Sequence, residues 1–389
     1  MARFVYADNA ATTRLSKTAL DHMLPWLQEG YGNPSSVYQL GRESRRALDQ
    51  ARDQVASALG AKPEEILFTG GGTEAANWAI RGVAKNLSAK GRHIITSAVE
   101  HHAVSHTLED LEKQGFEVTS LPVDQNGRVS TEELAAAIRP DTILITIMFA
   151  NNEIGTIQPV AEIGALAKAR GVLFHTDAVQ AVGHVPIDVQ AMHIDLLSLS
   201  AHKFRGPKGV GALYVRRGVK LPSFITGGGQ EKGQRAGTEN VAGIVGLAAA
   251  LSESVEHMEE HRAKTEALRD KLIAGMLALP AVTLTGDPKN RLPGNASFAV
   301  ACVEGEAMIL LLDAAGIAAS SGSACSSGAL DPSHVLLAIG LSHEAAHGSV
   351  RLSFGEENTE ADVDYILEKI PGIIEKLRAM SPLWEDHSP

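Results

Sequence analysis

The chain has 389 residues, is 44% hydrophobic and 21% charged, and carries a formal net charge of −11 with histidine neutral. These values fit a globular protein of about two or three domains, and the acidic balance argues against a nucleic acid or an anionic membrane as partner. Two cysteines exclude a disulfide scaffold. Residues 1–13 show no signal-like pattern, and the longest apolar stretch, 241–251, is too short to span a bilayer. We therefore expect a cytoplasmic protein.

The first half of the chain alternates β-rich runs with helical runs. Strands are predicted over residues 66–69, 93–96, 116–123, 142–149, 172–176, 194–200 and 210–215. Helices are predicted from near Thr73, over 131–138 with Thr131 as N-cap, and over 160–170. The apolar run 142–149 is typical of a strand covered on both faces. This alternation predicts an α/β fold with a largely parallel sheet.

The pattern changes after Asn240, where long helical segments occupy residues 241–279. Further elements are predicted in this order: strands over 282–284 and 296–303, a helix over 304–315, a helix capped by Asp331 and running to Ile339, a strand over 349–354 and a helix over 359–380. We therefore expect a large domain over 15–255, and a smaller α+β domain formed by 1–14 and 256–389.

Cys325 lies in a segment of small residues, about 318–330, that reads AASSGSACSSGAL. Gly and Ser favour a solvated loop, so its thiol is expected to be exposed and reactive, as a nucleophile that must travel would be. The alternative is a surface loop with an incidental cysteine. Cys302, within the apolar strand predicted over 296–303, is expected to be an inert core thiol.

Several chemically capable residues follow predicted strands, at the edge where open α/β sheets bind ligands. The glycine turn 70–72 with Thr73 opens a helix and predicts an anion site, although a plain tight turn is the alternative. Asp177 and Lys203 follow two further strands. A carboxylate that can pair with a pyridinium nitrogen and an amine that can form a Schiff base are what pyridoxal phosphate requires of a protein.

Three other polar residues could belong to the same site. His101 follows a strand, and its imidazole could stack on a cofactor ring or move protons. Asn152 also follows a strand, and Arg351 could bind a carboxylate in bidentate fashion. Each has an ordinary structural alternative, such as an ion pair for Arg351.

The segment HEAAH, residues 343–347, matches a zinc-protease signature. A strand is predicted from Ser349, so the helix carrying His343 and His347 can have at most about two turns. A zinc site is therefore not expected.

The motifs together resemble the cysteine desulfurases, in particular the NifS/IscS-like branch of the class V aminotransferase superfamily. The matching segments are 8–13 (DNAATT), 32–36 (GNPSS), 151–153 (NNE), 175–180 (HTDAVQ), 202–203 (HK), 235–240 (RAGTEN), 321–325 (SGSAC) and 381–384 (SPLW). The resemblance implies a fold-type I transferase that uses pyridoxal 5′-phosphate to convert L-cysteine to L-alanine, leaving sulfur on Cys325 as a persulfide.

The resemblance also implies a role for each matching residue. Lys203 would bind the cofactor covalently and Cys325 would accept sulfur, with His101 as a further catalytic residue. Cofactor contacts are implied for Gly72, Thr73, His101, Asn152, Asp177, Gln180, Ser200, His202 and, from the partner subunit of a homodimer, Thr238. Substrate contacts are implied for Asn33, Asn152 and Arg351, the last at the carboxylate.

The expected partners are an iron–sulfur scaffold protein or another sulfur acceptor, and Cys325 could share a transient 2Fe–2S cluster with that scaffold. One departure from the family pattern is Ala201, where Gly usually precedes the His-Lys pair. Two alternatives stay open: another aminotransferase or lyase of the same superfamily, and a non-enzymatic cluster-assembly protein.

Overall fold

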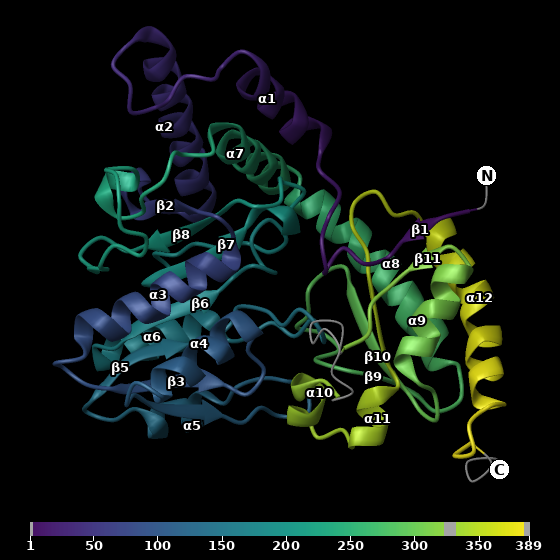
Figure 1. Cartoon of the computed structure of the whole chain (residues 1–389). Coiled ribbons are helices and arrows are strands. Elements are labelled where there is room, and N and C mark those ends of the chain that lie inside the picture. Colours follow the sequence, from purple (N-terminus) through teal and green to yellow (C-terminus); the bar gives the residue numbers. More distant parts are fainter. Residues whose placement is uncertain (1–2, 323–331, 385–389) are drawn as a thin grey trace.

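A computed structural model of the chain describes residues 3–322 and 332–384 and has two lobes (Figure 1). The larger lobe is built on a seven-stranded sheet. Its strands, in spatial order, are β2 (Ile66–Thr69), β8 (Gly211–Val215), β7 (Leu196–Ser200), β6 (Leu173–Asp177), β5 (Thr142–Thr146), β3 (His93–Ser97) and β4 (Glu117–Leu121). Only β8 runs antiparallel to its neighbours, which confirms the predicted α/β fold with a mostly parallel sheet.

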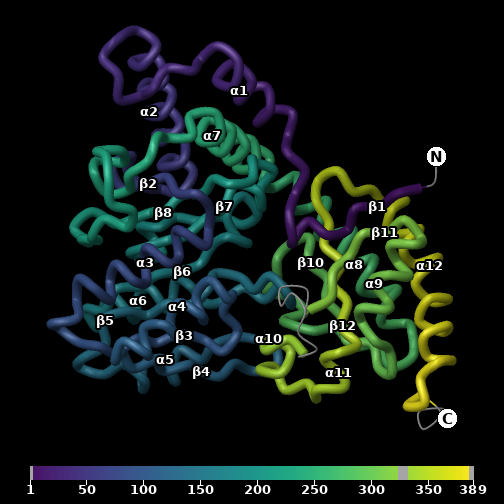
Figure 2. Tube along the Cα trace, viewed as in Figure 1, coloured from purple at the N-terminus to yellow at the C-terminus, as the bar shows by residue number. Residues whose placement is uncertain are grey.

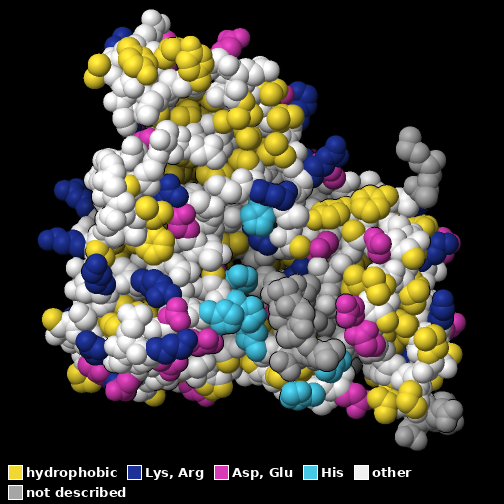
Figure 3. Space-filling view, in the orientation of Figure 1, with side chains coloured by type: hydrophobic (Ala, Val, Ile, Leu, Met, Phe, Trp, Pro, Cys, Tyr) yellow, Lys and Arg dark blue, Asp and Glu magenta, His cyan; other side chains and the backbone are white. Residues whose placement is uncertain are grey.

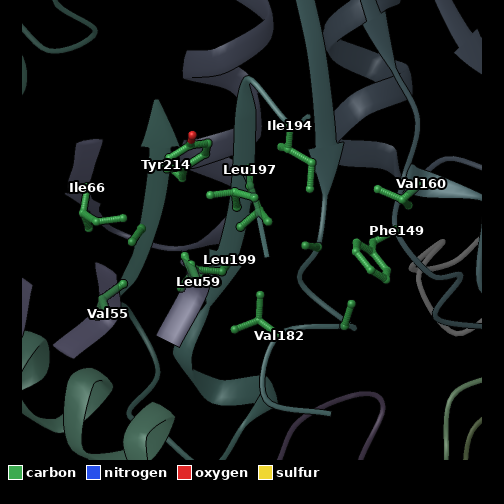
Figure 4. Close-up of a cluster of buried hydrophobic side chains, with 14 of the residues drawn as sticks. Val55, Leu59, Ile66, Phe149, Val160, Val182, Ile194, Leu197, Leu199 and Tyr214 are labelled. Carbon is green, nitrogen blue, oxygen red and sulfur yellow. The ribbon is translucent and has the colours of Figure 1, made fainter. Parts of the chain in front are cut away.

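The two faces of this sheet are covered by α2 (Gln39–Leu59), α3 (Gly72–Leu87), α4 (His102–Glu112), α5 (Thr131–Ala137), α6 (Val160–Arg170) and α7 (Val241–Glu256). A further helix, α1 (Lys17–Gln28), packs on α7. Successive strand residues point to opposite faces, so Leu196 joins the core under α3 while Leu197 joins the core shown in Figure 4. Burial on both faces explains why the central strand β5 is nearly all apolar between its two threonines.

The smaller lobe contains a three-stranded antiparallel sheet in the order β12 (Ser349–Ser353), β10 (Asn295–Val300) and β9 (Val282–Leu284). Around it lie α8 (Met258–Leu277), α9 (Gly305–Ala314), α10 (His334–Ala338), α11 (His343–His347) and α12 (Glu360–Arg378). The N-terminal strand β1 (Val5–Tyr6) pairs in parallel with β11 (Ile317–Ala318), side by side in Figure 2. The chain therefore begins in the smaller lobe before it enters the larger one.

Two predicted helix caps were wrong, one by one residue and the other by two. The cap of α5 is Ser130, not Thr131, because the Ser130 backbone is extended and its Oγ accepts a hydrogen bond from the Glu133 amide at 3.2 Å. The helix predicted from Asp331 begins at His334 and is capped by Ser333, whose Oγ accepts from two amides. Asp331 itself lies outside the described residues.

Two strands, predicted over 142–149 and 296–303, end three residues earlier than expected. Ladder pairing of β5 ends at Thr146, although the amides of Ile147 and Phe149 still donate to β6 carbonyls at 3.2 and 2.8 Å. β10 ends at Val300, so Cys302 lies in a turn with φ +59° rather than in a strand. Its side chain is buried, as predicted, and its Sγ donates to the Leu383 carbonyl at 3.4 Å.

The HEAAH segment forms the five-residue helix α11, followed directly by β12, as the sequence predicts. Across residues 3–322 and 332–384, no group of three or more His, Cys, Asp or Glu side chains is arranged to hold a metal ion. A search of the same residues for a helix with the length and apolarity of a membrane span finds none.

Candidate active site

Four predicted residues follow four neighbouring parallel strands. Lys203 ends the short turn after β7, Asp177 ends β6, Asn152 follows β5, and His101 follows β3 as the N-cap of α4. Since the order β7-β6-β5-β3 is continuous in the sheet, these residues share its carboxyl edge. The sequence separated them by up to about one hundred positions, and the sheet brings them to one edge.

The Lys203 amine contacts the N-terminal segment that crosses from the smaller lobe. Its Nζ donates to the carbonyls of Ala10 at 2.6 Å and Ala11 at 2.7 Å. Gln180 Nε2 donates to the same Ala10 carbonyl at 2.9 Å, and the Lys203 carbonyl lies 2.9 Å from His184 Nε2. The amine and the Gln180 amide therefore face one turn of backbone.

The charge of Asp177 affects the pKa of His101, and the charge of His101 affects the pKa of Asp177. Burial raises the pKa of Asp177, and the nearby His101, an amide hydrogen bond from Val179 and Lys203 oppose that rise. Burial lowers the pKa of His101, and the Asp177 charge opposes it. His101 Nδ1 accepts from the Ala103 amide at 3.0 Å, so a neutral imidazole carries its proton on Nε2.

The start of α3 has the features of a phosphate cradle. Its N-cap is Gly71, which supplies no side-chain cap, and a Cβ at Gly71 would meet nothing within 4 Å. The pocket in front of it is lined by Thr12, Gly70, Gly71, Gly72, Thr73, Ser200, His202 and Lys208, among others. Uncapped amides at a helix N-terminus, hydroxyls and a lysine suit a phosphate dianion.

His202 is a neutral member of this pocket. Burial, helped by the charges of Lys203 and Lys208, lowers its pKa to about 4. Its Nδ1 lies 3.0 Å from the Thr12 hydroxyl oxygen. The same sheet edge thus carries Asp177, which can pair with a pyridinium, and the hydrogen-bond donors for a phosphate. These residues fit pyridoxal phosphate.

Arg351 lies in β12 of the smaller lobe and reaches the same edge. Its Nη2 donates to Asp8 Oδ1 at 2.9 Å, and its Nη1 donates to the Asn152 carbonyl at 2.8 Å. Asp8 Oδ2 in turn accepts from the Ser320 hydroxyl at 2.9 Å. Arg351 therefore pairs with Asp8, a partner that sequence reasoning missed because the two residues are 343 positions apart.

Two predicted residues, Asn33 and Thr238, are not brought to this edge within the described chain. Asn33 is exposed in the connection between α1 and α2, where its Oδ1 accepts from the Ser35 amide at 2.9 Å. Thr238 is exposed and lines a different pocket, on the side of Gly70 next to α7. Cys325 lies outside the described residues.

The departure at Ala201 is matched by a glycine nearby. Ala201 is fully buried, and a Cβ on Gly206 would lie 2.7 Å from the Ala201 Cβ. The Gly206 amide also donates to the Ala201 carbonyl at 2.9 Å. The extra methyl group is therefore accommodated away from the phosphate cradle.

Sequence reasoning missed His175, which belongs to the HTDAVQ segment. It is fully buried, and its ring nitrogens lie 2.8 Å from the Thr146 hydroxyl and 2.9 Å from the Ser198 hydroxyl. Burial lowers its pKa to about 3, so the ring is neutral. It ties β5, β6 and β7 together just before Asp177 and so supports the position of that carboxylate.

Histidine side chains gather on the face shown in Figure 3. Four of them belong to α4, its cap and α10: the His102 ring stacks on His106 at 4.6 Å between centroids and lies 5.0 Å from His334 and 6.2 Å from His101. His334 Nε2 lies 2.9 Å from the Glu100 carbonyl, which fixes α10 beside the site.

Glu100 gives a prediction for stability against pH. Burial raises its pKa to about 8, opposed by the Ser97 hydroxyl and the Met148 amide, which both bind Oε1. Oε2 is buried and has no hydrogen-bond partner among the described residues. The folded protein therefore retains a proton that the unfolded chain releases near pH 4.5, so this group makes stability fall as pH rises from about 4.5 to about 8.

We expect Glu100→Gln to remove that slope. The variant should gain stability relative to the wild type by on the order of a few kcal/mol between pH 5 and pH 8. Thermal unfolding at several pH values measures the difference, with Glu112→Gln, an exposed residue of α4, as control. A difference that stays constant from pH 5 to pH 9 would contradict the assignment.

Comparison with known proteins gives a consistent result. The aminotransferase class-V family model matches residues 5–366. A curated cysteine desulfurase IscS of Clostridium botulinum is 56% identical over 390 residues, covering 100% of this chain and 98% of the relative. A solved structure described as a NifS-like protein is 41% identical with a TM-score of 0.91, covering 96% of this chain and 100% of that one. A second, SspA in complex with cysteine, is 39% identical with a TM-score of 0.81, covering 90% and 99%.

The chain is therefore a member of the class V aminotransferase family of pyridoxal-phosphate-dependent, fold-type I enzymes. Within that family it belongs to the cysteine desulfurases.

Proposed function

We propose that the protein converts L-cysteine to L-alanine and transfers the sulfur to Cys325 as a persulfide. The observation that carries this proposal is the placement of Lys203 and Asp177 on neighbouring strand ends, beside an uncapped helix N-terminus that suits a phosphate. The family relatives named cysteine desulfurase, and the related structure that contains cysteine, support this substrate.

Each residue of the sheet edge has a proposed cofactor contact. Lys203 holds the cofactor covalently, Asp177 pairs with the pyridine nitrogen, Gln180 and Asn152 contact the ring, and His101 stacks on it. Gly72, Thr73, Ser200 and His202 bind the phosphate. The burial of Asp177 supports this assignment, because a cationic ring nitrogen would offset the cost of a buried carboxylate.

When bound, pyridoxal phosphate withdraws electrons from the substrate Cα and thereby weakens the Cα–H and Cβ–S bonds. The Lys203 amine, held at the sheet edge, takes the Cα proton and returns it. His101 can present Nε2–H to a sulfur atom nearby as a hydrogen-bond donor, because its Nδ1 accepts from the Ala103 amide. Burial favours the neutral imidazole, and His101 can take up a thiol proton only when Nδ1 gives up that amide contact.

Arg351 is proposed to bind the substrate carboxylate, with Asn152 beside it and Asn33 as a further substrate contact. Arg351 is only 4% exposed, and the Nε of its guanidinium has no hydrogen-bond partner among the described residues. The substrate carboxylate would compete with Asp8 for the same guanidinium. We therefore expect the substrate to replace Asp8 on Arg351 when it binds.

The sulfur step balances without an external oxidant or reductant. The Cys325 thiol and cysteine give a Cys325 persulfide and alanine, with the substrate Cβ gaining hydrogen as it loses sulfur. We propose that the persulfide then passes to an iron–sulfur scaffold protein or another acceptor, and that Cys325 can share a transient 2Fe–2S cluster with it.

A homodimer and a cytoplasmic location complete the proposal. Thr238 would reach the partner's phosphate, and its exposure is consistent with that role. Leu24, Leu27 and Tyr31, in and after α1, are apolar and exposed, which supports an interface there. We also propose that 15–255 and the pair of segments 1–14 and 256–389 are the two domains, since their hydrophobic cores are largely separate.

The function is tested by product stoichiometry. The purified, cofactor-loaded protein is incubated with L-cysteine and no thiol reductant, and alanine is quantified together with sulfane sulfur on the protein. We expect about one alanine per active site in a first burst, with a 32-Da addition to the peptide that contains Cys325. Pyruvate or an amino-group exchange product without protein-bound sulfur would instead indicate another reaction of the superfamily.

A further inference from the structure

A buried carboxyl group lies where the two ends of the Cys325 segment meet the larger lobe. It belongs to Glu153, in the turn after β5, and the residue is 6% exposed. None of the proposed roles above uses this side chain. Its neighbours come from three distant parts of the chain, around residues 322, 333 and 351.

The first contact is with the C-terminal end of the segment. The Ser333 hydroxyl donates a short hydrogen bond to Glu153 Oε2. The same Ser333 Oγ accepts from the amides of Val335 at 3.1 Å and Leu336 at 3.3 Å, and so caps α10. The Glu153 carboxyl therefore fixes the residue at which the chain leaves the Cys325 segment and enters a helix.

The N-terminal end of the segment lies close to the same carboxyl group without a hydrogen bond to it. The Gly322 amide donates to the Ser349 hydroxyl at 3.0 Å. A Cβ built on Gly322 would lie 3.3 Å from the same Glu153 Oε2 and 3.0 Å from Ser349 Oγ. Only glycine leaves this approach uncrowded, so one carboxyl oxygen lies against both ends of the segment.

The turn that carries Glu153 is itself well anchored. Asn151 Oδ1 accepts from the Glu153 amide at 2.8 Å, and Asn151 Nδ2 donates to the Val99 carbonyl at 2.9 Å. The intervening Asn152 carbonyl accepts from Arg351 at 2.8 Å. One rigid turn therefore contacts the proposed substrate arginine, presents Asn152 and supports the Cys325 segment.

We propose that Glu153 is a positioning residue: its carboxyl group accepts a hydrogen bond from Ser333 and packs close to Gly322, and so sets where Cys325 can meet the substrate sulfur. This inference rests on the proposed function of Cys325 as sulfur acceptor. It assigns Glu153 to the sulfur-transfer step and not to cofactor or substrate binding.

The electrostatic setting agrees with a hydrogen-bonding role. Burial raises the pKa of Glu153 to about 7, while the Ser333 hydrogen bond and the positive charge of Arg351 oppose the rise. A neutral amide could keep the acceptor oxygen without the cost of a buried charge. Glu153→Gln should therefore substitute for the wild-type residue, whereas Glu153→Ala should not.

The test compares Glu153→Ala, Glu153→Gln, Ser333→Ala and the double variant Glu153→Ala/Ser333→Ala as cofactor-loaded enzymes. We expect kcat for alanine formation to fall about 10- to 100-fold in Glu153→Ala, with cofactor absorbance and KM for cysteine within about twofold. Glu153→Gln should stay within about threefold of the wild type. The double variant should be no worse than the poorer single variant, because both remove one contact.

A second readout is independent of turnover. The rate at which iodoacetamide alkylates the Cys325 peptide should change at least about threefold in Glu153→Ala and remain near wild type in Glu153→Gln. Glu162→Ala, an exposed carboxylate in α6, is the matched control.

An unchanged kcat in Glu153→Ala, a loss that appears as raised KM or lost cofactor, or additive effects in the double variant would each overturn the inference. If the wild type formed no alanine, the proposed function would fail instead. The alkylation rates would still decide whether Glu153 sets the position of Cys325, so the two failures are distinguishable.

Discussion

Lys203→Ala is expected to abolish covalent cofactor attachment and to lower alanine formation by at least about 10³-fold. The variant removes the amine that is proposed both to hold the cofactor and to move the Cα proton. The phosphate pocket at α3 and the Asp177 carboxylate remain, so the cofactor should still bind, but without a covalent link. Borohydride reduction followed by peptide mapping measures the link directly.

The matched control for this prediction is Lys220→Ala, which removes an exposed lysine that does not line the phosphate pocket. It should give the same modified peptide as the wild type, containing Lys203, and the same rate. A borohydride-stable modification at another lysine in the wild type, or near-normal turnover by Lys203→Ala, would remove the basis of the proposed function.

Cys325→Ala is expected to keep the bound cofactor and its absorbance while losing sulfur transfer by about 10³-fold or more. The proposed cofactor contacts come from the sheet edge and from the α3 N-terminus, and neither contains this residue. Addition of L-cysteine should therefore still perturb the cofactor spectrum, whereas neither sulfide nor protein-bound sulfane sulfur should accumulate.

The second cysteine of the chain provides the control. Cys302 is buried behind β10 with its Sγ on the Leu383 carbonyl, so Cys302→Ala should cost about 1 kcal/mol of stability at most and leave turnover intact. If Cys325→Ala released sulfur at the wild-type rate, or if Cys302→Ala were the inactive variant, the assignment of the acceptor thiol would be wrong.

The sheet of the larger lobe could be predicted because most of its strands are short runs, rich in apolar residues and buried on both faces, that alternate with helices. The N-terminal elements could not. β1 has only two residues, and its pairing with β11 depends on contacts across more than three hundred positions. α1 contains Pro25 and leaves Leu24 and Leu27 exposed, so its pattern does not indicate a buried face.

The same division applies to the site. Asp177, Lys203 and His101 could be predicted, since strand ends in a parallel sheet converge at one edge whatever the rest of the chain does. Glu153 and Asp8 could not, because their importance comes from partners in the other lobe, Ser333 and Arg351. The sequence pattern around one residue gives no information on a partner that comes close only when the two lobes pack together.

The N-terminal segment links the lobes at the reactive amine. Tyr6 is paired into the smaller lobe through β1, whereas the carbonyls of Ala10 and Ala11 bind Lys203 in the larger lobe. A hinge movement between the lobes would therefore pull these peptide groups away from the lysine, so that interdomain motion and the hydrogen bonding of a single side chain are mechanically coupled.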